Sequence, residues 1–265
     1  MLISLCPAYG TAPAFFEAIS VDDVMGYLKG LPEDSTVFID IDDTIITPCS
    51  TAFRASSPDK SMIDQIKEKR ELYPNFEDIL SHWRLSRKTM LIDKKWPDAL
   101  KDLSSRGIKA FGLTQMGTGK FGSIPSMEQW RYNELRSLGI VFSELPDSPQ
   151  AKVTGASLYK GIYFTGDKNS KSETLAQFIP LVAGSTLIII DDREKHLADL
   201  QKFCAEHGIK FVGILFKGLE MVPGQPNPAV SKFQKEYLIE HAKWLEDDEV
   251  KELMQRAERK VVSGL

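Results

Sequence analysis

Acidic side chains follow a short apolar segment, residues 37–39, at Asp40, Asp42 and Asp43, and Thr44 comes next. An apolar segment of this kind is typical of a buried parallel strand. Ligands of open α/β sheets bind beyond the carboxyl ends of the strands, so Asp40 and Asp42 would lie where an active site is expected. The same residues would also suit a strand end followed by a turn, in which Asp side chains bond to the nearby backbone.

Two later segments end in polar residues in the same way. The apolar residues 108–113 lead to Thr114, and the strand-like run 186–190 leads to Asp191 and Asp192. Lys171 begins an amphipathic helix between them. Because the carboxyl ends of parallel strands meet at one edge of a sheet, we expect these side chains to converge with Asp40.

Such a set of residues suits phosphoryl transfer through an aspartyl phosphate. A carboxylate attacks phosphorus only when its own charge and that of the phosphate are offset, and Mg²⁺ and a lysine can do this together. Mg²⁺ binds oxygen ligands, usually one or two carboxylates with water and the substrate phosphate, and Asp40 and Asp191 would supply the carboxylates. A second carboxylate, Asp42, could protonate the leaving oxygen and then activate water.

The ordered set resembles the four motifs of the haloacid dehalogenase (HAD) superfamily of phosphohydrolases. The matching residues are Asp40-x-Asp42-x-Thr44, Thr114, Lys171 and Asp191-Asp192. The resemblance covers roughly residues 36–192. It implies a three-layer, Rossmann-like α/β core with a mostly parallel central sheet and a Mg²⁺-dependent phosphatase that hydrolyses a phosphomonoester.

The resemblance also implies a role for each residue. Asp40 would be the nucleophile, and Asp42 the general acid and base. Thr114 would hold the phosphoryl oxygens, and Lys171 would balance charge. The Mg²⁺ ion would be bound by Asp40, by the backbone carbonyl of Asp42, by Asp191 and by Asp192. Thr44 and Gln115 are expected to contact the substrate, Gln115 as a further donor to phosphate.

Several alternatives accompany this interpretation. Lys168 competes with Lys171, which is preferred because it lies at the start of the apolar-periodic helix. Receiver domains combine similar groups, but they place the acidic pair on the first strand and the lysine last. Asp43 is interpreted as a residue that faces away from the site or caps locally. The four histidines share no metal-binding spacing and are interpreted as surface or packing residues; they are His82, His196, His207 and His241.

A helical insertion is expected after the first motif, because a long stretch separates Thr44 from Thr114. Residues 57–93 would form this cap, and residues 1–56 and 94–265 the core with C-terminal helices. The insertion is rich in aromatic and basic side chains. In one interpretation the aromatic side chains form its own small core and the basic ones its solvent-exposed face. In the other, both form a wall that meets the leaving group. Arg54, just before it, is the best candidate for a substrate contact. A cap of this size favours a small or flat phosphomonoester and is compatible with phosphotyrosine.

The remaining elements follow from periodicity and capping residues. Helices are expected at 21–31, 96–106, 126–138, 171 to about 180–184, 196–207 and 232–262, the last as one helix or two. Strands are expected at 140–142 and 209–216, and a hairpin at 153–164.

Composition limits the class of protein. The net charge of −4 and the pI near 5.7 argue against a nucleic-acid partner. Three scattered cysteines predict neither a disulfide framework nor a zinc site and favour a reducing compartment. Residues 1–20 make a poor signal peptide and cannot span a membrane, so a cytoplasmic location is expected.

The overall layout further resembles a little-characterised bacterial branch of the superfamily from intracellular pathogens. Some members of that branch are secreted effectors with phosphotyrosine phosphatase activity, which would imply secretion into a host cell and a phosphoprotein substrate in place of a phosphorylated small molecule. Two other functions are compatible with the sequence. One is a non-catalytic HAD-like scaffold that binds a partner protein through its charged C-terminal helix, and the other is a phosphotransferase that uses the same intermediate. Neither the physiological substrate nor the oligomeric state follows from the sequence.

Overall fold

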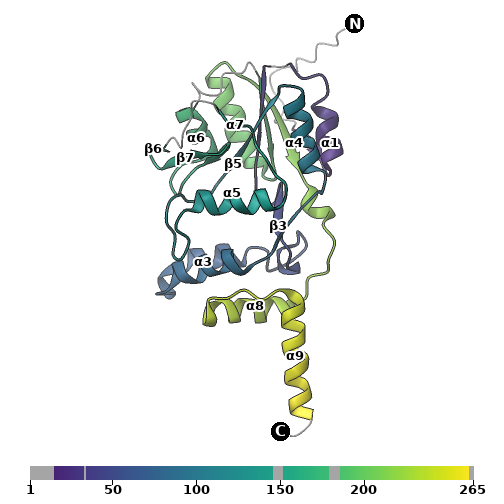
Figure 1. Ribbon diagram of the computed structural model, residues 1–265, viewed down its shortest axis with the longest axis vertical. Coiled ribbons are helices and arrows are strands. Elements are labelled where there is room, and N and C mark those ends of the chain that lie inside the picture. The colour runs from purple at the N-terminus through teal and green to yellow at the C-terminus, as the bar shows by residue number, and fades with distance from the viewer. Residues whose placement is uncertain (1–14, 33, 146–151, 179–185, 263–265) are drawn as a thin grey trace.

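The computed structural model of the protein describes residues 15–32, 34–145, 152–178 and 186–262. A sheet of eight strands lies at its centre, in the order β1-β10-β9-β2-β5-β8-β7-β6 (Figure 1). The first six strands in this order are parallel to their neighbours, and β7 and β6 are each antiparallel to the preceding one. The expected α/β fold with a mostly parallel central sheet is confirmed.

The strands and helices have the following bounds. The strands of the sheet are β1 (Phe16–Ala18), β2 (Ser35–Ile39), β5 (Lys109–Thr114), β6 (Lys152–Val153), β7 (Ala156–Tyr159), β8 (Ile162–Phe164), β9 (Thr186–Asp191) and β10 (Lys210–Phe216). The helices packed around it are α1 (Val21–Tyr27), α4 (Trp96–Ser105), α5 (Met127–Ser137), α6 (Lys171–Phe178) and α7 (Glu194–Glu206).

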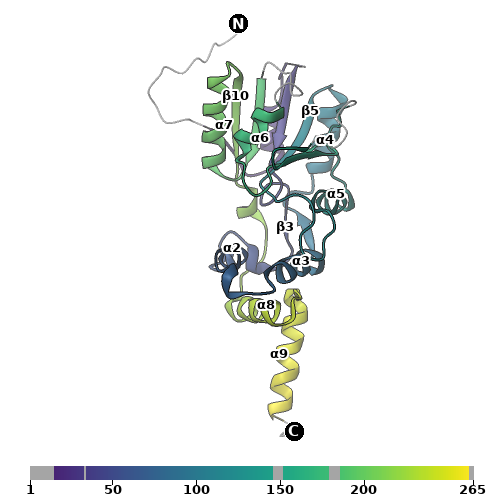
Figure 2. The ribbon, with the colours of Figure 1, turned by 90° about the vertical axis from the view of Figure 1, so that its left-hand side faces the viewer.

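Helices cover both faces of the sheet because side chains alternate along each buried strand. On β2, Val37 and Ile39 belong to the apolar cluster that includes α1, α4 and α5. Phe38, between them, belongs to the cluster on the other face, with Leu175 of α6 and Leu197 of α7. Figure 2 shows α6 and α7 on one side of the sheet and α4 on the other. The sheet is therefore buried on both sides, which fits its parallel strands.

The segment inserted after β2 forms a separate layer below the sheet (Figure 1). Its elements are η1 (Thr51–Phe53), α2 (Met62–Glu68), η2 (Arg70–Leu72) and α3 (Phe76–Ser86). Two short antiparallel strands, β3 (Ile46–Pro48) and β4 (Thr89–Leu91), carry the chain into and out of this layer. The insertion is thus attached through one two-stranded ribbon.

The last two helices pack against the insertion and away from the sheet. After β10 and the short η4 (Gly218–Met221), the chain forms α8 (Pro228–His241) and α9 (Asp247–Val262). Leu238 of α8 and Trp244 belong to the same apolar cluster as Phe53 and Trp83. The sequence analysis assigned these helices to the core, but the layer that they complete is that of the insertion. A small helical layer of this kind needs the extra apolar surface to bury its own core.

Most expected elements are present, with small shifts at their ends. The hairpin at 153–164 and the helix capped by Ser126 are confirmed. The strand expected at residues 140–142 is wrong. These residues are irregular, and the backbone contact with β5 is made after them, by the N–H of Ser143, which donates to the carbonyl of Ala110. The C-terminal stretch is two helices, with Ala242 in a left-handed conformation at the break (φ 48°). The expected helix end near residues 180–184 and most of residues 1–20 lie outside the described part.

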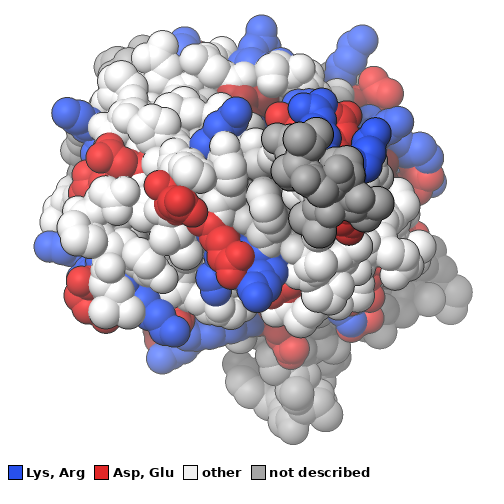
Figure 3. Space-filling model, turned by 90° about the horizontal axis from the view of Figure 1, so that it is seen from below, with Lys and Arg blue, Asp and Glu red and all other residues white. Residues whose placement is uncertain are grey.

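None of the helices in the described part of the chain is both long and apolar enough to cross a membrane. Acidic and basic side chains alternate with uncharged surface on the face that carries the C-terminal helices (Figure 3). This face therefore carries no broad patch of one sign.

We expect Trp244→Ala to destabilise the protein by roughly 3–5 kcal/mol, as truncation of a buried Trp usually does. Trp244 is 1% exposed, and its ring centroid lies 5.4 Å from that of Phe53. Urea unfolding of the variant would measure the loss. Leu253→Ala, on the exposed part of α9, is the control and should change the stability little. Equal effects of the two substitutions would contradict the packing of the C-terminal segment on the insertion.

Candidate active site

The residues predicted to carry chemistry lie at the carboxyl edge of the sheet. β2 lies between β9 and β5, which are parallel to it, so the ends of all three strands open to the same side. The chain passes from β2 to β5 in one direction and later reaches β9 in the other, so the strand order reverses at this point. Crevices at such reversals are the usual ligand sites of α/β sheets.

Lys171 joins two of the predicted carboxylates. Its Nζ donates to Oδ1 of Asp40 and to Oδ2 of Asp191, each at 2.5 Å. All three side chains are buried, with 9% or less of each side chain exposed. Lys168, the alternative at this position in the sequence, is exposed to solvent. The structure thus brings Lys171, and not Lys168, to the carboxylates.

Lys171 affects the two carboxylates that it contacts to different degrees. Burial raises the pKa of Asp40 to about 6, although Lys171 opposes the shift. Burial also acts on Asp191, but there Lys171 and His196 outweigh it and lower the pKa to about 2. Lys171 itself keeps a raised pKa, because the two carboxylates outweigh its burial. The ammonium group therefore remains charged and offsets part of the acidic charge.

Asp192 completes a cluster that could hold a cation. Ligand oxygens of Asp40, Asp191 and Asp192 all lie within 4.8 Å of one another. Burial, followed by repulsion from Asp40 and Asp191, raises the pKa of Asp192 to about 8. Three close carboxylates with one ammonium leave negative charge uncompensated, and hard divalent cations prefer such oxygen ligands. The donor set fits Mg²⁺, although oxygen ligands alone do not distinguish it from other hard cations.

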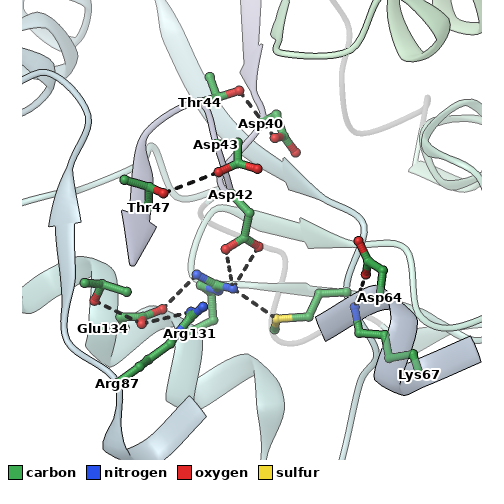
Figure 4. A network of polar contacts seen from close by, with 12 residues as sticks. Asp40, Asp42, Asp43, Thr44, Thr47, Asp64, Lys67, Arg87, Arg131 and Glu134 are labelled. Atoms are coloured by element: carbon green, nitrogen blue, oxygen red, sulfur yellow. Dashed lines mark hydrogen bonds and ion pairs between the residues drawn. The ribbon is translucent and has the colours of Figure 1, made fainter. Parts of the chain in front are cut away.

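Asp42 points away from this cluster. Its two carboxylate oxygens accept hydrogen bonds from Nη2 of Arg131 at 3.0 and 2.8 Å (Figure 4). Burial tends to raise the pKa of Asp42, but the charges of Arg131 and Arg87 outweigh it and hold the pKa below its ordinary value. Arg131 therefore fixes both the direction and the ionised state of this side chain.

The turn after β2 fixes the direction of Asp40 and Asp42. Asp43 has a left-handed backbone (φ 63°), a conformation that Asp tolerates better than most residues. Its carboxylate contacts Thr47 and Lys60, and it also lines the cavity described below. Thr44 is fully buried, and its hydroxyl lies 3.4 Å from Oδ2 of Asp40. Thr44 thus contacts Asp40 on the side away from the cavity. A residue that contacts the substrate would line the cavity, and Thr44 does not.

A cavity of about 500 Å³ separates the sheet edge from the insertion. On the core side, Thr114 and Gln115 line it together with Asp40, Asp42 and Asp192. The lining residues of the insertion, including the segment before α2, are Phe53, Lys60, Ile63, Asp64, Lys67, Trp83, Arg84 and Arg87. The insertion therefore contributes a second wall, as expected for a cap, and this wall is rich in basic and aromatic side chains.

Arg54 does not line this cavity. Its guanidinium is buried and donates to four backbone carbonyls, which belong to Pro48, Cys49, Ser50 and Pro223. Each of its three nitrogens donates inside the protein. The expectation of a substrate contact therefore gives way to a structural role, since a buried guanidinium must satisfy its N–H groups with nearby acceptors.

Two cavity residues escaped the sequence analysis. His196, interpreted there as surface or packing, has Nδ1 3.1 Å from Oδ1 of Asp191. Arg131 was not assigned to the site, whereas Arg84 and Arg87 belong to the basic side chains of the insertion, for which one interpretation was a wall that meets the leaving group. A signal was available for Arg131, because it stands four residues after Met127 and four before Leu135, on the buried face of α5. A charged residue at such a position needs a buried partner.

We expect the stability of the metal-free protein to decrease as pH rises from about 4 to 8. The folded pKa of Asp192 is about 8, against an ordinary value of 3.8, so the folded protein keeps a proton that the unfolded chain has already lost. This contribution is complete below pH 4 and is lost as pH rises through 8. Thermal unfolding in EDTA would measure it, and added Mg²⁺ should stabilise more at pH 8 than at pH 5.

Asp192→Asn should reduce both the slope with pH and the effect of Mg²⁺. Asp167→Asn is a matched control, because Asp167 lines the same cavity outside the cluster. An unchanged slope in Asp192→Asn would contradict the assignment of the excess charge to this cluster.

Comparisons with known proteins place this chain in a family. The profile of the family described as "Protein of unknown function (DUF2608)" matches residues 17–251. An uncharacterised protein of Rickettsia prowazekii (strain Madrid E) is 28% identical over 272 residues, which cover 96% of each chain. No solved structure gives a significant match. Because the family match spans most of the chain, including every residue of the candidate site, the protein belongs to the DUF2608 family.

Proposed function

We propose that the protein is a phosphatase of the HAD type that hydrolyses a phosphomonoester through an aspartyl phosphate on Asp40. The observation that carries the proposal is the position of Lys171, whose ammonium contacts both Asp40 and Asp191 at 2.5 Å. A carboxylate that attacks a phosphate needs such a fixed positive charge beside it.

The neighbouring residues support the same reaction. A carboxylate oxygen of Asp40 attacks phosphorus as the bond from phosphorus to the leaving oxygen breaks. Thr114, buried at the end of β5 and lining the cavity, is placed to hold a phosphoryl oxygen, and Gln115 is a further donor. Water then attacks the phosphorus of the intermediate, which releases inorganic phosphate and restores the carboxylate of Asp40.

Asp42 serves as the general acid and base in this proposal. Once released from Arg131, its carboxylate would take up a proton, give that proton to the leaving oxygen and later accept one from the attacking water. Its present ion pair with Arg131 directs it toward the insertion side of the cavity. Asp42 must therefore exchange this ion pair for a contact with the leaving group during turnover.

Asp40, Asp191 and Asp192 would hold a Mg²⁺ ion, with the backbone carbonyl of Asp42 as a further ligand, and the ion would supply positive charge to the phosphoryl oxygens. His196 and the backbone N–H of Arg193, which donates to Oδ1 of Asp191 at 2.9 Å, would keep Asp191 in place. Such outer contacts commonly orient metal-binding carboxylates.

The cavity limits the size of the substrate. A volume of about 500 Å³, closed on one side by the insertion, suits a small or flat leaving group. Phe53 and Trp83 on the insertion wall could pack against an aromatic ring, so a phosphotyrosine side chain is a compatible substrate.

We expect the protein to hydrolyse p-nitrophenyl phosphate in the presence of Mg²⁺ and to lose this activity in EDTA. Asp40→Asn removes the nucleophile and should lower kcat by roughly a thousandfold or more. Phosphate release would measure both effects, and a thermal melt would show that the variant is folded. Asp22→Asn, an exposed carboxylate paired with Lys95, is the control and should retain full activity. Full activity of Asp40→Asn would exclude the proposed mechanism.

A further inference from the structure

Three arginines gather on the side of the cavity away from Asp40. Arg84 and Arg87 come from α3 and its end, and Arg131 comes from α5. All three line the cavity. Figure 4 shows Arg87 and Arg131 beyond Asp42 as seen from Asp40. The cavity therefore has a carboxylate-rich end on the core and an arginine-rich end next to the insertion.

Acidic partners satisfy only part of this arginine cluster. Glu134 accepts from Arg131 at 2.7 Å and from Arg87 at 3.3 Å, and Asp42 takes the other side of Arg131. The guanidinium of Arg84 donates only to the carbonyl of Leu80, and no carboxylate in the described part of the chain lies within ion-pair distance of it. The cluster thus carries positive charge beyond that of its acidic partners.

Buried donors in the cluster are also free. Nε of Arg87 and Nε of Arg131 are buried and have no hydrogen-bond partner among the described residues. The two residues are 9% and 3% exposed. A buried N–H without an acceptor is unfavourable, so the protein would gain from a ligand that supplies acceptor oxygens here.

Aromatic rings hold the guanidinium groups in place. The guanidinium of Arg87 lies 4.3 Å from the ring centroid of Trp83, and that of Arg84 lies 4.9 Å from the ring centroid of Phe121. Stacked guanidinium groups present their N–H edges in fixed directions, and these edges match the two oxygens of a carboxylate or phosphate. Burial and the charges of Arg87 and Arg131 lower the pKa of Arg84 to about 10, and a bound anion would relieve this repulsion.

We infer that this arginine cluster binds a second anionic group of the substrate. The substrate is then a small phosphomonoester whose leaving group carries a carboxylate or a further phosphate, with the transferred phosphate at Asp40 and the second anion at Arg84, Arg87 and Arg131. This inference rests on the proposed function. An anion that binds Arg131 would also release Asp42, because the anion and Asp42 compete for the same N–H groups of Arg131.

Matched substrates would test the inference. We would compare kcat/KM for the phosphate ester of a hydroxycarboxylic acid, for the corresponding amide of the same length, and for the bisphosphate of the corresponding diol. The acid or the bisphosphate should exceed the amide by roughly tenfold or more, the usual effect of a charged hydrogen bond, and the better of the two identifies the second anion. Equal kcat/KM values for all three esters, with activity present, would overturn the inference and leave the phosphatase proposal intact.

Substitutions at Arg84 would then locate the effect. Arg84→Gln should bring the ratio of kcat/KM for the charged ester to kcat/KM for the amide close to one. Arg84→Lys keeps the charge but loses the paired N–H donors of the guanidinium, so it should give an intermediate ratio. Arg70→Gln, an exposed arginine of the same insertion that does not line the cavity, should leave the ratio and the activity unchanged. A full ratio in Arg84→Gln would overturn the inference.

A binding measurement separates the two proposals if no ester is hydrolysed. Glutarate, a dicarboxylate without phosphate, should change the tryptophan fluorescence of the protein in a saturable way, because Arg87 covers the ring of Trp83. The change should be lost in Arg84→Gln and kept in Arg70→Gln. Saturable binding without any hydrolysis would contradict the phosphatase proposal and support the anion site, and an absence of binding would contradict the anion site.

Discussion

A single buried ammonium group, that of Lys171, allows carboxylates from two neighbouring strands to lie together at the sheet edge. Parallel strands bring their carboxyl ends to one side, so the acidic residues after β2 and β9 cannot avoid one another. Isolated buried carboxylates cost several kcal/mol each and would protonate instead. Lys171 compensates Asp40 and Asp191 but leaves Asp192 with a pKa of about 8. The strand order therefore brings more carboxylates to this edge than Lys171 alone can neutralise.

The parts of the site that follow from strand ends could be predicted from the sequence. Short, largely apolar runs identify β2, β5 and β9, and the polar residue that follows each run must lie at the common edge. Lys171 was predictable because it begins an amphipathic helix that leads back to β9. The strand expected at 140–142 failed because the backbone contact with β5 is made by Ser143, after the apolar residues, and does not extend back along them.

A second wall formed by the insertion was one of two interpretations of the sequence, but the side chains that line it could not be predicted, because this depends on packing between segments that are distant in sequence. Arg54, Arg84 and Arg87 are all basic residues in or beside the insertion, and local sequence does not distinguish them. The guanidinium of Arg54 donates its hydrogen bonds to backbone carbonyls, one of them that of Pro223, whereas Arg84 faces the cavity. His196 was missed for a different reason. Its partner, the strand residue Asp191, lies only five positions earlier across a turn, but no metal-binding spacing marks the four histidines.

The C-terminal helices are linked to the wall of the cavity through the insertion. The carboxylate of Asp247, at the first turn of α9, accepts hydrogen bonds from Ser50 and from the backbone and hydroxyl of Thr51. Phe53, in the same short helix as Thr51, lines the cavity. The start of α9 and the cavity wall therefore share one hydrogen-bonded network, so a substitution that removes the carboxylate of Asp247 would weaken the support of Phe53 as well as the start of the helix.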